Sequence, residues 1–531
     1  MVTVAHRDGI VAGEVAKCII LPVIPSGSRG CNAANTVGEA RLSISNLTSE
    51  KIRDVSTDAR HDRRGGRATI NPSTLPGAAA KSRDMKLRFL LVISTAASLT
   101  SFAQQNPQQL ADAELPSLLT IYKDVHSHPE LSTQEQRTSA LLAKELKAVG
   151  CDVTENVGKY EKADQKCYGV VGVMKNGDGP VVLVRTDLDA LPVQEETGLP
   201  YASTVVSKNE KGDDVHVMHA CGHDVHVSTL IGVARSLAKL KDQWHGTLVF
   251  VGQPAEELGT GARAMLRDGL YTRWPKPNYA LGFHDKADLE IGHIGVTEGY
   301  TSANVDSVDV TVHGIGGHGA YVHRTKDPIV LAAEIINQWQ TIASRETNPL
   351  DPIVVTVGSI HGGTKHNIIP DEVKMQLTVR TYKAEVRERV LAAIERIAKG
   401  CASAAGLPAD KMPTANVLRD HFAPAMYNDP ELTKRLVAVW KKALGDQNVE
   451  MVDPTMGGED FSEYSLVPEH SIPTANFHVG AVDPAKLAES KKPGAAPLPT
   501  LHSSKFAPVP EPTIRTGVVA MTAAVLDLMK K

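Results

Sequence analysis

No stretch of the 531-residue sequence approaches twenty uninterrupted apolar residues, so no membrane-spanning helix is predicted. Six cysteines in a chain of this length are too few for a disulfide-stapled scaffold. Residues 104–531 contain 43 Lys and Arg but 53 Asp and Glu, so this part of the chain carries a net negative charge. A net negative charge argues against a nucleic-acid partner. The 42% of apolar and 22% of charged residues instead indicate a folded chain of about three to four domain lengths.

The first hundred residues differ from the rest. Residues 1–84 show no sustained helical or strand period, and we expect them to be disordered. From Met85, Lys86 and Arg88 precede the apolar run FLLVISTAASL, and small residues follow as far as Ala103. This pattern is typical of a secretory signal peptide and predicts a periplasmic or secreted protein with no membrane partner after leader removal. Because a leader is read as it emerges first, we expect Met85 to be the true start, after an over-extended gene model; a short buried helix is the alternative interpretation.

The remaining chain alternates between strand-like and helix-like segments. Residues 110–150 indicate helices, because SALLAKELKAVG places apolar residues three and four apart and stops at a glycine. Strand-like apolar runs follow at residues 170–174, 181–185 and 246–252. Strands that alternate with helices predict an α/β fold whose sheet is mainly parallel and covered on both faces.

A second unit is predicted from about residue 302. Its segments follow the order strand, helix, strand, strand, helix, strand, which is the ferredoxin-like α+β plan. Helix and strand signals resume from Pro430, so we expect a catalytic domain in two pieces with a smaller domain inserted. The predicted divisions are an extension 1–84, a signal peptide 85–103, the catalytic domain 104–301 and 422–531, and the inserted domain 302–421.

The densest group of metal-capable side chains lies in the sequence HACGHDVH, residues 219–226. Cys221 and His223 are separated by one glycine and can point at a common position from a loop. Thiolate and imidazole ligands suit a borderline ion such as zinc. A lone histidine is more often structural, but four metal-capable side chains so close together favour a metal site.

Two further motifs fall where a site is expected in an open α/β sheet, just beyond the carboxyl ends of strands. Glu256 and Glu257 follow the strand-like residues 247–252, and His284 follows residues 279–281. Adjacent carboxylates can divide the work, because one can bind a metal ion while the other takes a proton from water that the ion acidifies. A solvated surface pair is the alternative interpretation of the two glutamates.

Several motifs occur in a characteristic order across residues 110–531: HACGHD, QPAEE, an FH after a strand, GGHGA, HNIIP, GGEDF and LHSSKF. In this combination the sequence resembles the aminoacylase, hippurate hydrolase and indole-acetyl-amino-acid hydrolase group of dinuclear metal amidohydrolases. The resemblance implies a zinc-peptidase-like catalytic domain with an inserted lid and dimerisation domain. It also implies two divalent metal ions per subunit, and ligands of N, O and S type accept zinc, manganese, cobalt or nickel.

By this resemblance, the metal ligands are Cys221, His223, Glu257, His284 and His502. Glu256 is the implied general base. Asp187 and Asp189, in RTDLDALP, are expected to support the site, and Asp224 is expected to orient a neighbouring imidazole as an acceptor. For these three aspartates, turn or cap chemistry is the alternative.

The inserted domain carries three further residues to which the resemblance assigns roles. His318, in GGHGA, is expected to stabilise the developing oxyanion, commonly across a dimer interface, while Asn367 and Arg380 are expected to hold the substrate. An arginine suits a planar carboxylate because two parallel hydrogen bonds can form. The sequence YVH at 321–323 departs from the Ala-Pro-His of many members, so the path of this loop is not defined by the resemblance. We expect the polar insertion at 205–217 to shape substrate access.

The sequence thus predicts an exported amidohydrolase that cleaves small-molecule N-acyl amino acids with metal-activated water and forms a homodimer through the inserted domain. Three alternatives stay open: a dipeptidase or carboxypeptidase of the same fold, a cysteine hydrolase that uses Cys221, and a ligand-binding homologue that has lost catalysis. Cys151 and Cys167 lie in neighbouring strand-like segments and are candidates for a disulfide in an oxidising compartment.

Overall fold

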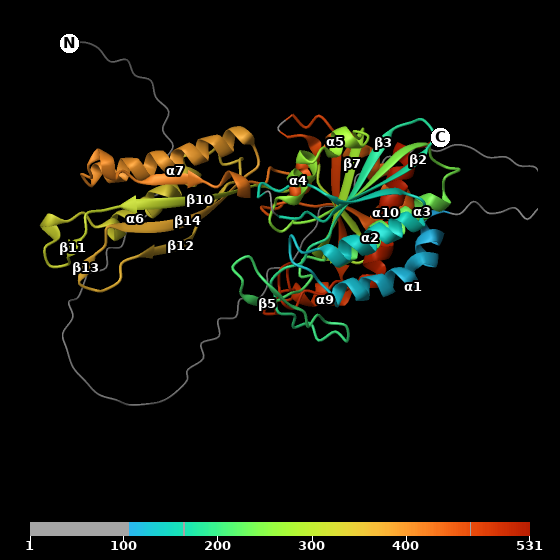
Figure 1. Ribbon diagram of the computed structural model, residues 1–531, viewed down its shortest axis with the longest axis horizontal. Helices are drawn as coiled ribbons and strands as arrows, with labels where there is room; N and C mark the ends of the chain where they lie inside the picture. Colours follow the sequence, from blue (N-terminus) through green and yellow to red (C-terminus); the bar gives the residue numbers. More distant parts are fainter. Residues whose placement is uncertain (1–105, 163–164, 468) are drawn as a thin grey trace, which may run out of the picture. The chain divides into compact units, whose positions relative to one another are not determined.

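The computed structural model describes residues 106–162, 165–467 and 469–531 (Figure 1). The signal peptide predicted to end at Ala103 and the extension before it lie outside the described residues. Within the described part, no helix combines the length and the apolar character that crossing a membrane requires. Two main sheets organise these residues, one of eight strands and one of four.

The larger sheet of the described residues is mainly parallel. Its spatial order is β1 (Asp152–Val157), β2 (Gly169–Asn176), β6 (Gly246–Gln253), β3 (Val181–Asp187), β7 (Tyr279–Glu290), β18 (Thr474–Val482), β8 (Ile294–Val296) and β17 (Val449–Met451). The pairs β6–β3, β3–β7, β7–β18 and β8–β17 are parallel, and the pairs β1–β2, β2–β6 and β18–β8 are antiparallel. The predicted α/β fold is therefore confirmed, and β18 joins the sheet from late in the chain, between β7 and β8.

Helices cover both faces of this sheet (Figure 1). One face is packed by α1 (Pro107–His126), α2 (Gln136–Ala148), α3 (His223–Lys239), α8 (Pro430–Leu444) and α10 (Pro510–Leu528). The other face carries α4 (Gly261–Arg267), α5 (Leu270–Arg273) and the 3-10 helix η6 (Asp460–Ser465). Helix α1 begins at a capping box, because the Asn106 side chain accepts a hydrogen bond from Gln109 N–H at 2.9 Å and the Gln109 side chain accepts one from Asn106 N–H at 3.3 Å.

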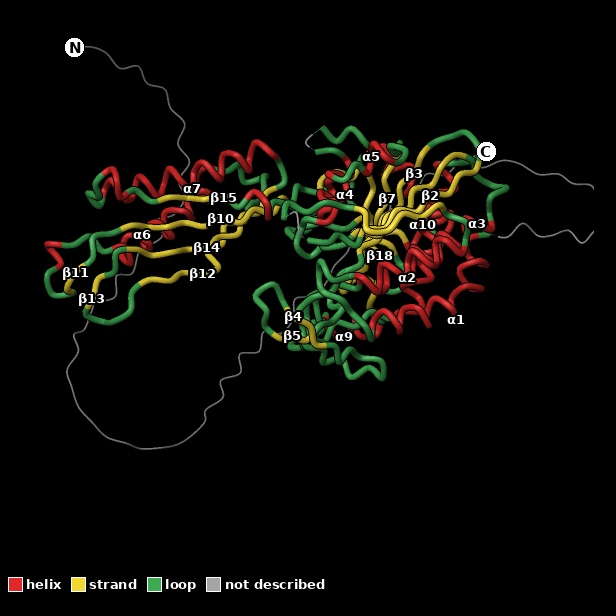
Figure 2. Tube along the Cα trace, in the orientation of Figure 1, coloured by secondary structure: helices red, strands yellow, loops and turns green. Residues whose placement is uncertain are grey.

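The smaller sheet has the ferredoxin-like plan predicted from the order of the segments. Its antiparallel strands lie in the order β12 (Val354–Gly362), β14 (Glu372–Thr381), β10 (Asn304–His313) and β15 (Thr414–Val417). Helices α6 (Pro328–Thr341) and α7 (Ala384–Ala404) pack with it in one core (Figure 2). Along β10, the buried Val308, Val310 and Val312 alternate with more exposed residues, which is the period of a half-buried strand.

Shorter elements complete the described chain. Three pairs of short strands are β4 (Val206–Lys208) with β5 (Asp214–His216), β9 (Gly299–Tyr300) with β16 (Tyr427–Asn428), and β11 (Gly317–His318) with β13 (Ile368–Ile369). The short helices are η1 (Val322–Arg324), the π-helical η2 (Ile342–Glu346), η3 (Ala409–Lys411), η4 (Arg419–His421), η5 (Asp446–Asn448) and α9 (Pro484–Ser490).

The candidate disulfide between Cys151 and Cys167 is not formed, because both are free cysteines. Cys151 is buried near Leu146 in the core beneath α2. Cys167 is buried where the chain passes Gly158. Burial raises the pKa of Cys151 to about 12 and that of Cys167 to about 11, so neither thiol is ionised at neutral pH.

Candidate metal centre and active site

The metal-capable motif forms the turn that begins α3. Gly222 has a left-handed backbone, with φ of 81°, and a Cβ there would lie 2.3 Å from the Asp285 carboxylate. No other residue fits this position without displacing Asp285. The turn places Cys221 just before the helix and His223 at its first residue, so two side chains that are close in sequence converge on one region.

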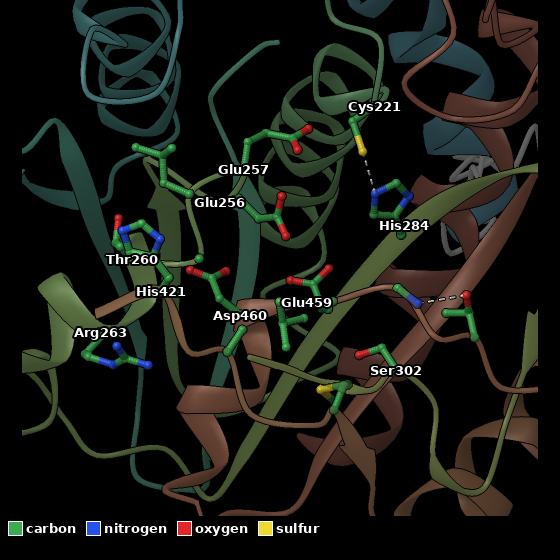
Figure 3. A pocket seen from close by; sticks show the side chains of 18 of the residues that line it. Cys221, Glu256, Glu257, Thr260, Arg263, His284, Ser302, His421, Glu459 and Asp460 are labelled. Atoms are coloured by element: carbon green, nitrogen blue, oxygen red, sulfur yellow. Dashed lines mark hydrogen bonds between the residues drawn. The ribbon is translucent and has the colours of Figure 1, made fainter. Parts of the chain in front are cut away.

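Five predicted ligands from distant parts of the chain meet at one place, and Figure 3 shows three of them, Cys221, Glu257 and His284. Cys221 Sγ lies 3.4 Å from His284 Nε2 and 3.3 Å from His502 Nε2. Glu257 Oε2 lies 3.5 Å from His502 Nε2, and Glu257 Oε1 lies 3.8 Å from His223 Nε2. Donor atoms of S, N and O type at these mutual distances can hold divalent cations such as zinc.

The orientation of the imidazoles fits metal binding. His223 donates from Nδ1 to the Asp189 carbonyl at 2.8 Å, and His284 donates from Nδ1 to the Asp285 carbonyl at 2.7 Å. With Nδ1 protonated, each Nε2 keeps a lone pair free for a ligand bond. His223 Nε2 and Glu257 Oε1 are buried without a hydrogen-bond partner among the described residues, and such atoms are rare unless another group satisfies them. The residues present therefore fit a metal centre.

The electrostatics of the site also favour a cation. Burial, together with the charges of Glu459 and Glu257, raises the pKa of Glu256 well above its ordinary value. Burial raises the pKa of Glu257 to about 7 and that of the Cys221 thiol well above its usual range. A nearby cation stabilises the anionic form of all three groups. These three side chains supply no positive charge themselves, so the cluster favours the binding of a cation.

Asp187, at the end of β3, is held among cationic groups. Its Oδ1 accepts a hydrogen bond from His226 Nδ1 at 2.6 Å. Burial alone would raise its pKa, but His223, His226 and Arg185 hold the pKa of Asp187 well below its usual range. His226, although part of the metal-capable motif, is thereby engaged with Asp187, and its Nε2 lies 3.1 Å from Asp285 Oδ1.

Asp224 orients the imidazole of His126, on α1. Its Oδ2 accepts a hydrogen bond from His126 Nδ1 at 2.6 Å, and Glu195 Oε1 lies 3.1 Å from His126 Nε2. Burial lowers the pKa of His126, but the two carboxylates outweigh it and raise that pKa to about 10. The expected acceptor role thus joins Asp224 to a histidine that the sequence analysis did not single out.

Two buried carboxylates fix the turn that carries the glutamate pair. Asp189 Oδ2 accepts a hydrogen bond from Glu257 N–H at 3.0 Å. Glu135 accepts one from Ala255 N–H, and its side chain is fully buried. No role for Glu135 was predicted, and no local pattern marks it, because its partner lies 120 residues later in the chain.

Arg185 is a second residue that the sequence analysis missed. Its guanidinium is buried, with Nη1 2.7 Å from Asp187 and Nη2 3.1 Å from Glu459 and 3.2 Å from Asp460. Arg185 also donates from Nε to Gln253 Oε1 at 3.0 Å. The motifs RTDLD and GGEDF contain these charges, but only the fold brings the two motifs together.

The site opens into a cleft of about 1010 Å³ that is lined by Cys221, Glu256, Glu257, His284 and His502, among others. Arg380, on β14 of the smaller sheet, also lines the cleft; it is half-buried, and its guanidinium forms no hydrogen bond or ion pair with a described residue. Glu210 lines it as well, in the loop between β4 and β5, within the insertion that was expected to shape substrate access.

His318 and Asn367 do not line the cleft of their own chain within the described part. Both are exposed, and the adjacent Gly319 N–H donates to the Asn367 carbonyl at 2.9 Å, so the two residues belong to one surface. The sequence YVH at 321–323 is exposed and leads into the single turn η1. Arg380 therefore lines the same cleft as the predicted metal ligands, whereas His318 and Asn367 lie elsewhere on the inserted domain.

The family model of peptidase family M20/M25/M40 matches residues 183–495. The chain belongs to this family. The M20 protein is 35% identical over 369 residues to the N-acetyl-L-cysteine deacetylase of Bacillus subtilis, which covers 69% of this chain and 81% of that relative. It is 33% identical over 406 residues to thermostable carboxypeptidase 1 of Saccharolobus solfataricus, which covers 76% of this chain and 93% of that one.

A solved structure supports the same assignment. The dinuclear metal-binding peptidase of the M20 family from Bacillus subtilis matches with a TM-score of 0.61 and 28% identity, over 79% of this chain and 99% of that one. The predicted family and the predicted enzyme class are thus confirmed, and this M20 protein is a metal-binding hydrolase. The roles of its individual site residues stay predictions, supported by the geometry described above.

Proposed function

We propose that this M20 enzyme hydrolyses the amide bond of N-acyl amino acids. One arrangement carries the proposal: four of the five predicted ligands, Glu256 and the unpaired guanidinium of Arg380 line the same cleft, and the fifth ligand, His223, lies buried beside them. An N-acyl amino acid offers the matching chemistry, because its amide carbonyl suits the cluster and its carboxylate suits the guanidinium. A relative that is named as the deacetylase of N-acetyl-L-cysteine supports this substrate class.

The residues of the chain account for hydrolysis with two proton transfers. Two divalent ions held by the five-ligand cluster would supply Lewis acidity and lower the pKa of water. Glu256 takes a proton from the attacking water as the water oxygen bonds to the amide carbon. It then delivers that proton to the amide nitrogen as the C–N bond breaks, which yields a carboxylic acid and a free amino acid.

The test is a substrate panel assayed with metal-stripped enzyme. N-acetyl amino acids, N-benzoyl amino acids and dipeptides are supplied, and zinc, manganese, cobalt and nickel are restored separately. We expect hydrolysis to disappear on stripping and to return with at least one ion, fastest on N-acyl amino acids. Cleavage that continues in the presence of EDTA would contradict the proposal and would favour a cysteine hydrolase that uses Cys221. Binding without turnover under every ion would indicate the catalytically silent homologue.

Carboxypeptidase or dipeptidase activity is the second candidate. The relative from Saccharolobus solfataricus carries the name carboxypeptidase, and it is 33% identical to this chain. A dipeptide also presents an amide next to a terminal carboxylate, so the same cluster and Arg380 could bind it. Faster cleavage of dipeptides than of N-acyl amino acids in the panel would decide for this candidate.

We also propose a homodimer formed through the inserted domain. Of the eleven exposed large apolar side chains of the described residues, eight lie in this domain: Ile315, Tyr321, Val322, Ile329, Val330, Leu350, Ile360 and Ile368. Strand β12 is an edge of its sheet, which leaves backbone groups free for pairing. His318 lies in the same region, with its ring 5.2 Å from that of Tyr321. A second copy bound here could receive His318 and Asn367 in its own cleft, where an imidazole donor would stabilise the oxyanion.

Mixing two inactive variants tests this arrangement. Glu256→Gln removes the base from its own site, and His318→Ala removes the donor from the partner's site. In a mixed dimer one of the two sites keeps both groups. Random exchange makes about half of the dimers mixed, so about a quarter of the wild-type activity should return. No recovery on mixing, or a monomer in sedimentation, would contradict the proposal.

We propose in addition that the enzyme is exported. The support is the leader-like sequence between Met85 and Ala103. N-terminal sequencing of the mature protein from the periplasmic or culture fraction should begin at Gln104. A cytoplasmic product that begins before Met85 would contradict export.

A further inference from the structure

A polar wall on β18 has no role in the hydrolysis described above. Asn476 and His478 both line the cleft. Residues two apart on a strand share a face of the sheet. The alternate residues Ala475, Phe477 and Val479 belong to the core on the face that α1, α3, α8 and α10 cover. Strand geometry therefore directs the two polar side chains to the cleft side.

The register of the sheet sets this wall beside the metal ligands. Strand β18 runs parallel to β7, with His478 opposite His284 and Asn476 opposite Gly282. Because neighbouring strands lie about 4.8 Å apart, His478 is one strand spacing from a predicted metal ligand. Gly282 has no side chain, so Asn476 supplies the only side chain of this pair of neighbouring residues on β18 and β7.

One polar atom of each residue of the wall has no hydrogen-bond partner among the described residues. Asn476 Oδ1 and His478 Nδ1 are buried without a hydrogen bond, and so is Oγ of Ser302, which lines the same cleft (Figure 3). The backbone of Asn476, by contrast, is fixed, because its N–H donates to Asn428 Oδ1 at 2.7 Å and its carbonyl accepts from Asn428 Nδ2 at 2.8 Å. Asn476, His478 and Ser302 each line the cleft and also carry a buried polar atom that no described group satisfies, which is the arrangement of a binding position.

We propose that Asn476, His478 and Ser302 form a subsite for an uncharged hydrogen-bonding group of the substrate, such as a hydroxyl or a carboxamide. This inference rests on the proposed function, since it concerns the same cleft. An amide, a neutral imidazole and a hydroxyl each have both donor and acceptor capacity, which matches a neutral polar group. A hydrocarbon group would leave these atoms unpaired, and sites built from hydrogen-bonding groups discriminate strongly against such analogues.

Two pairs of isosteric substrates identify the half of the substrate that is bound there. N-acetylserine and N-acetyl-2-aminobutyrate exchange a hydroxyl for a methyl in the amino-acid half. N-glycolylalanine and N-propionylalanine make the same exchange in the acyl half. We expect the metal-loaded enzyme to favour the hydroxyl member of one pair by about tenfold or more in kcat/KM. Asn476→Leu and His478→Phe should each reduce that ratio towards one.

Controls separate the possible failures. Ser302→Ala is the smallest change and tests the subsite even where a larger substitution fails to fold, which thermal unfolding and metal content report. Asn416→Leu, on an exposed position of β15, should leave the ratio unaltered. A ratio near one in both pairs, or a preference that survives all three substitutions, overturns the subsite while hydrolysis upholds the proposed function. Hydrolysis of none of the four compounds overturns the proposed function and the subsite with it.

Discussion

Glu135 Oε1 accepts a hydrogen bond from the backbone N–H of Ala255 at 2.8 Å, and this contact fixes the chain immediately before Glu256. The same oxygen accepts from Thr133 N–H at 2.7 Å, so one buried carboxylate joins the segment before α2 to the turn after β6. Ala255 has φ of 49°, a left-handed conformation that is strained for alanine. The hydrogen bond opposes relaxation of this strain, which makes Glu135 a positioning residue for the proposed base.

Glu135→Ala should therefore lower kcat by about 10- to 100-fold with little change in KM, because misplacement of a catalytic group by about 1 Å has effects of this size. Glu135→Gln keeps an acceptor oxygen and should lose less activity. Steady-state kinetics with metal analysis measure both. Glu155→Ala, at a partly exposed position of β1 where Glu155 pairs only with Lys147 on the surface, is the control. Wild-type kinetics for Glu135→Ala would refute the positioning role.

Glu256→Gln should keep the bound metal and reduce kcat by about 100- to 10,000-fold, because the amide cannot accept the proton of the attacking water. Turnover and metal content are measured on the same preparation. Glu450→Gln, at an exposed position of β17, should behave as the wild type. Unchanged turnover in Glu256→Gln would remove Glu256 from the mechanism.

Cys221→Ser should lose both metal and activity, since a hydroxyl is a far weaker ligand than a thiolate. Metal content by mass spectrometry and kcat/KM with N-acetyl amino acids check this outcome. Cys401→Ser, a half-buried position on α7, controls for the loss of a thiol. Full metal occupancy in Cys221→Ser would show that Cys221 is not a ligand.

Arg185→Met should destabilise the fold by about 3–5 kcal/mol, because it leaves Asp187, Glu459 and Asp460 buried without their cation. Urea unfolding of the metal-free protein gives the free energy directly. Arg435→Met, which breaks a partly exposed pair with Asp527, should cost less than about 1 kcal/mol. Equal losses in the two variants would argue against the buried network.

His126 should make stability depend on alkaline pH. Its pKa is raised from 6.5 to about 10 in the folded protein, so the folded state binds its proton more tightly than the unfolded state. The stabilisation is fully present below pH 6.5 and is lost as the pH rises towards 10. Denaturation of the wild type and of His126→Gln at pH 6 and pH 9 should show the difference between them shrinking at the higher pH. A surface control is His293→Gln, which removes a pair with Glu450. A difference that stays constant would count against the buried cation.

Much of the fold was predictable because its elements are encoded locally. The apolar runs at 170–174, 181–185 and 246–252 became β2, β3 and β6, since a strand covered on both faces requires a continuous apolar sequence. The inserted domain followed from the order of its segments. The antiparallel start of the sheet, β1 and β2, was not predicted, because strand direction depends on connections rather than on composition.

The site was predictable only in part. Adjacent residues such as Cys221 and His223 were found from their spacing, whereas His502 could be assigned only through the resemblance to known hydrolases. The role of Glu135 was not predicted because its hydrogen-bond partners are backbone N–H groups, and a pattern of side chains does not reveal such partners. The disulfide prediction failed for a related reason: nearness in sequence between Cys151 and Cys167 does not determine where their side chains are buried.

The late arrival of β18 has a consequence for biosynthesis. A nascent chain released only as far as residue 473 has β7 and β8 but not the strand that lies between them, and it also lacks His502. The ribosome must therefore finish almost the whole polypeptide before the catalytic centre can close. We therefore expect a chain that ends before β18 to lack both a complete sheet and a complete set of predicted ligands.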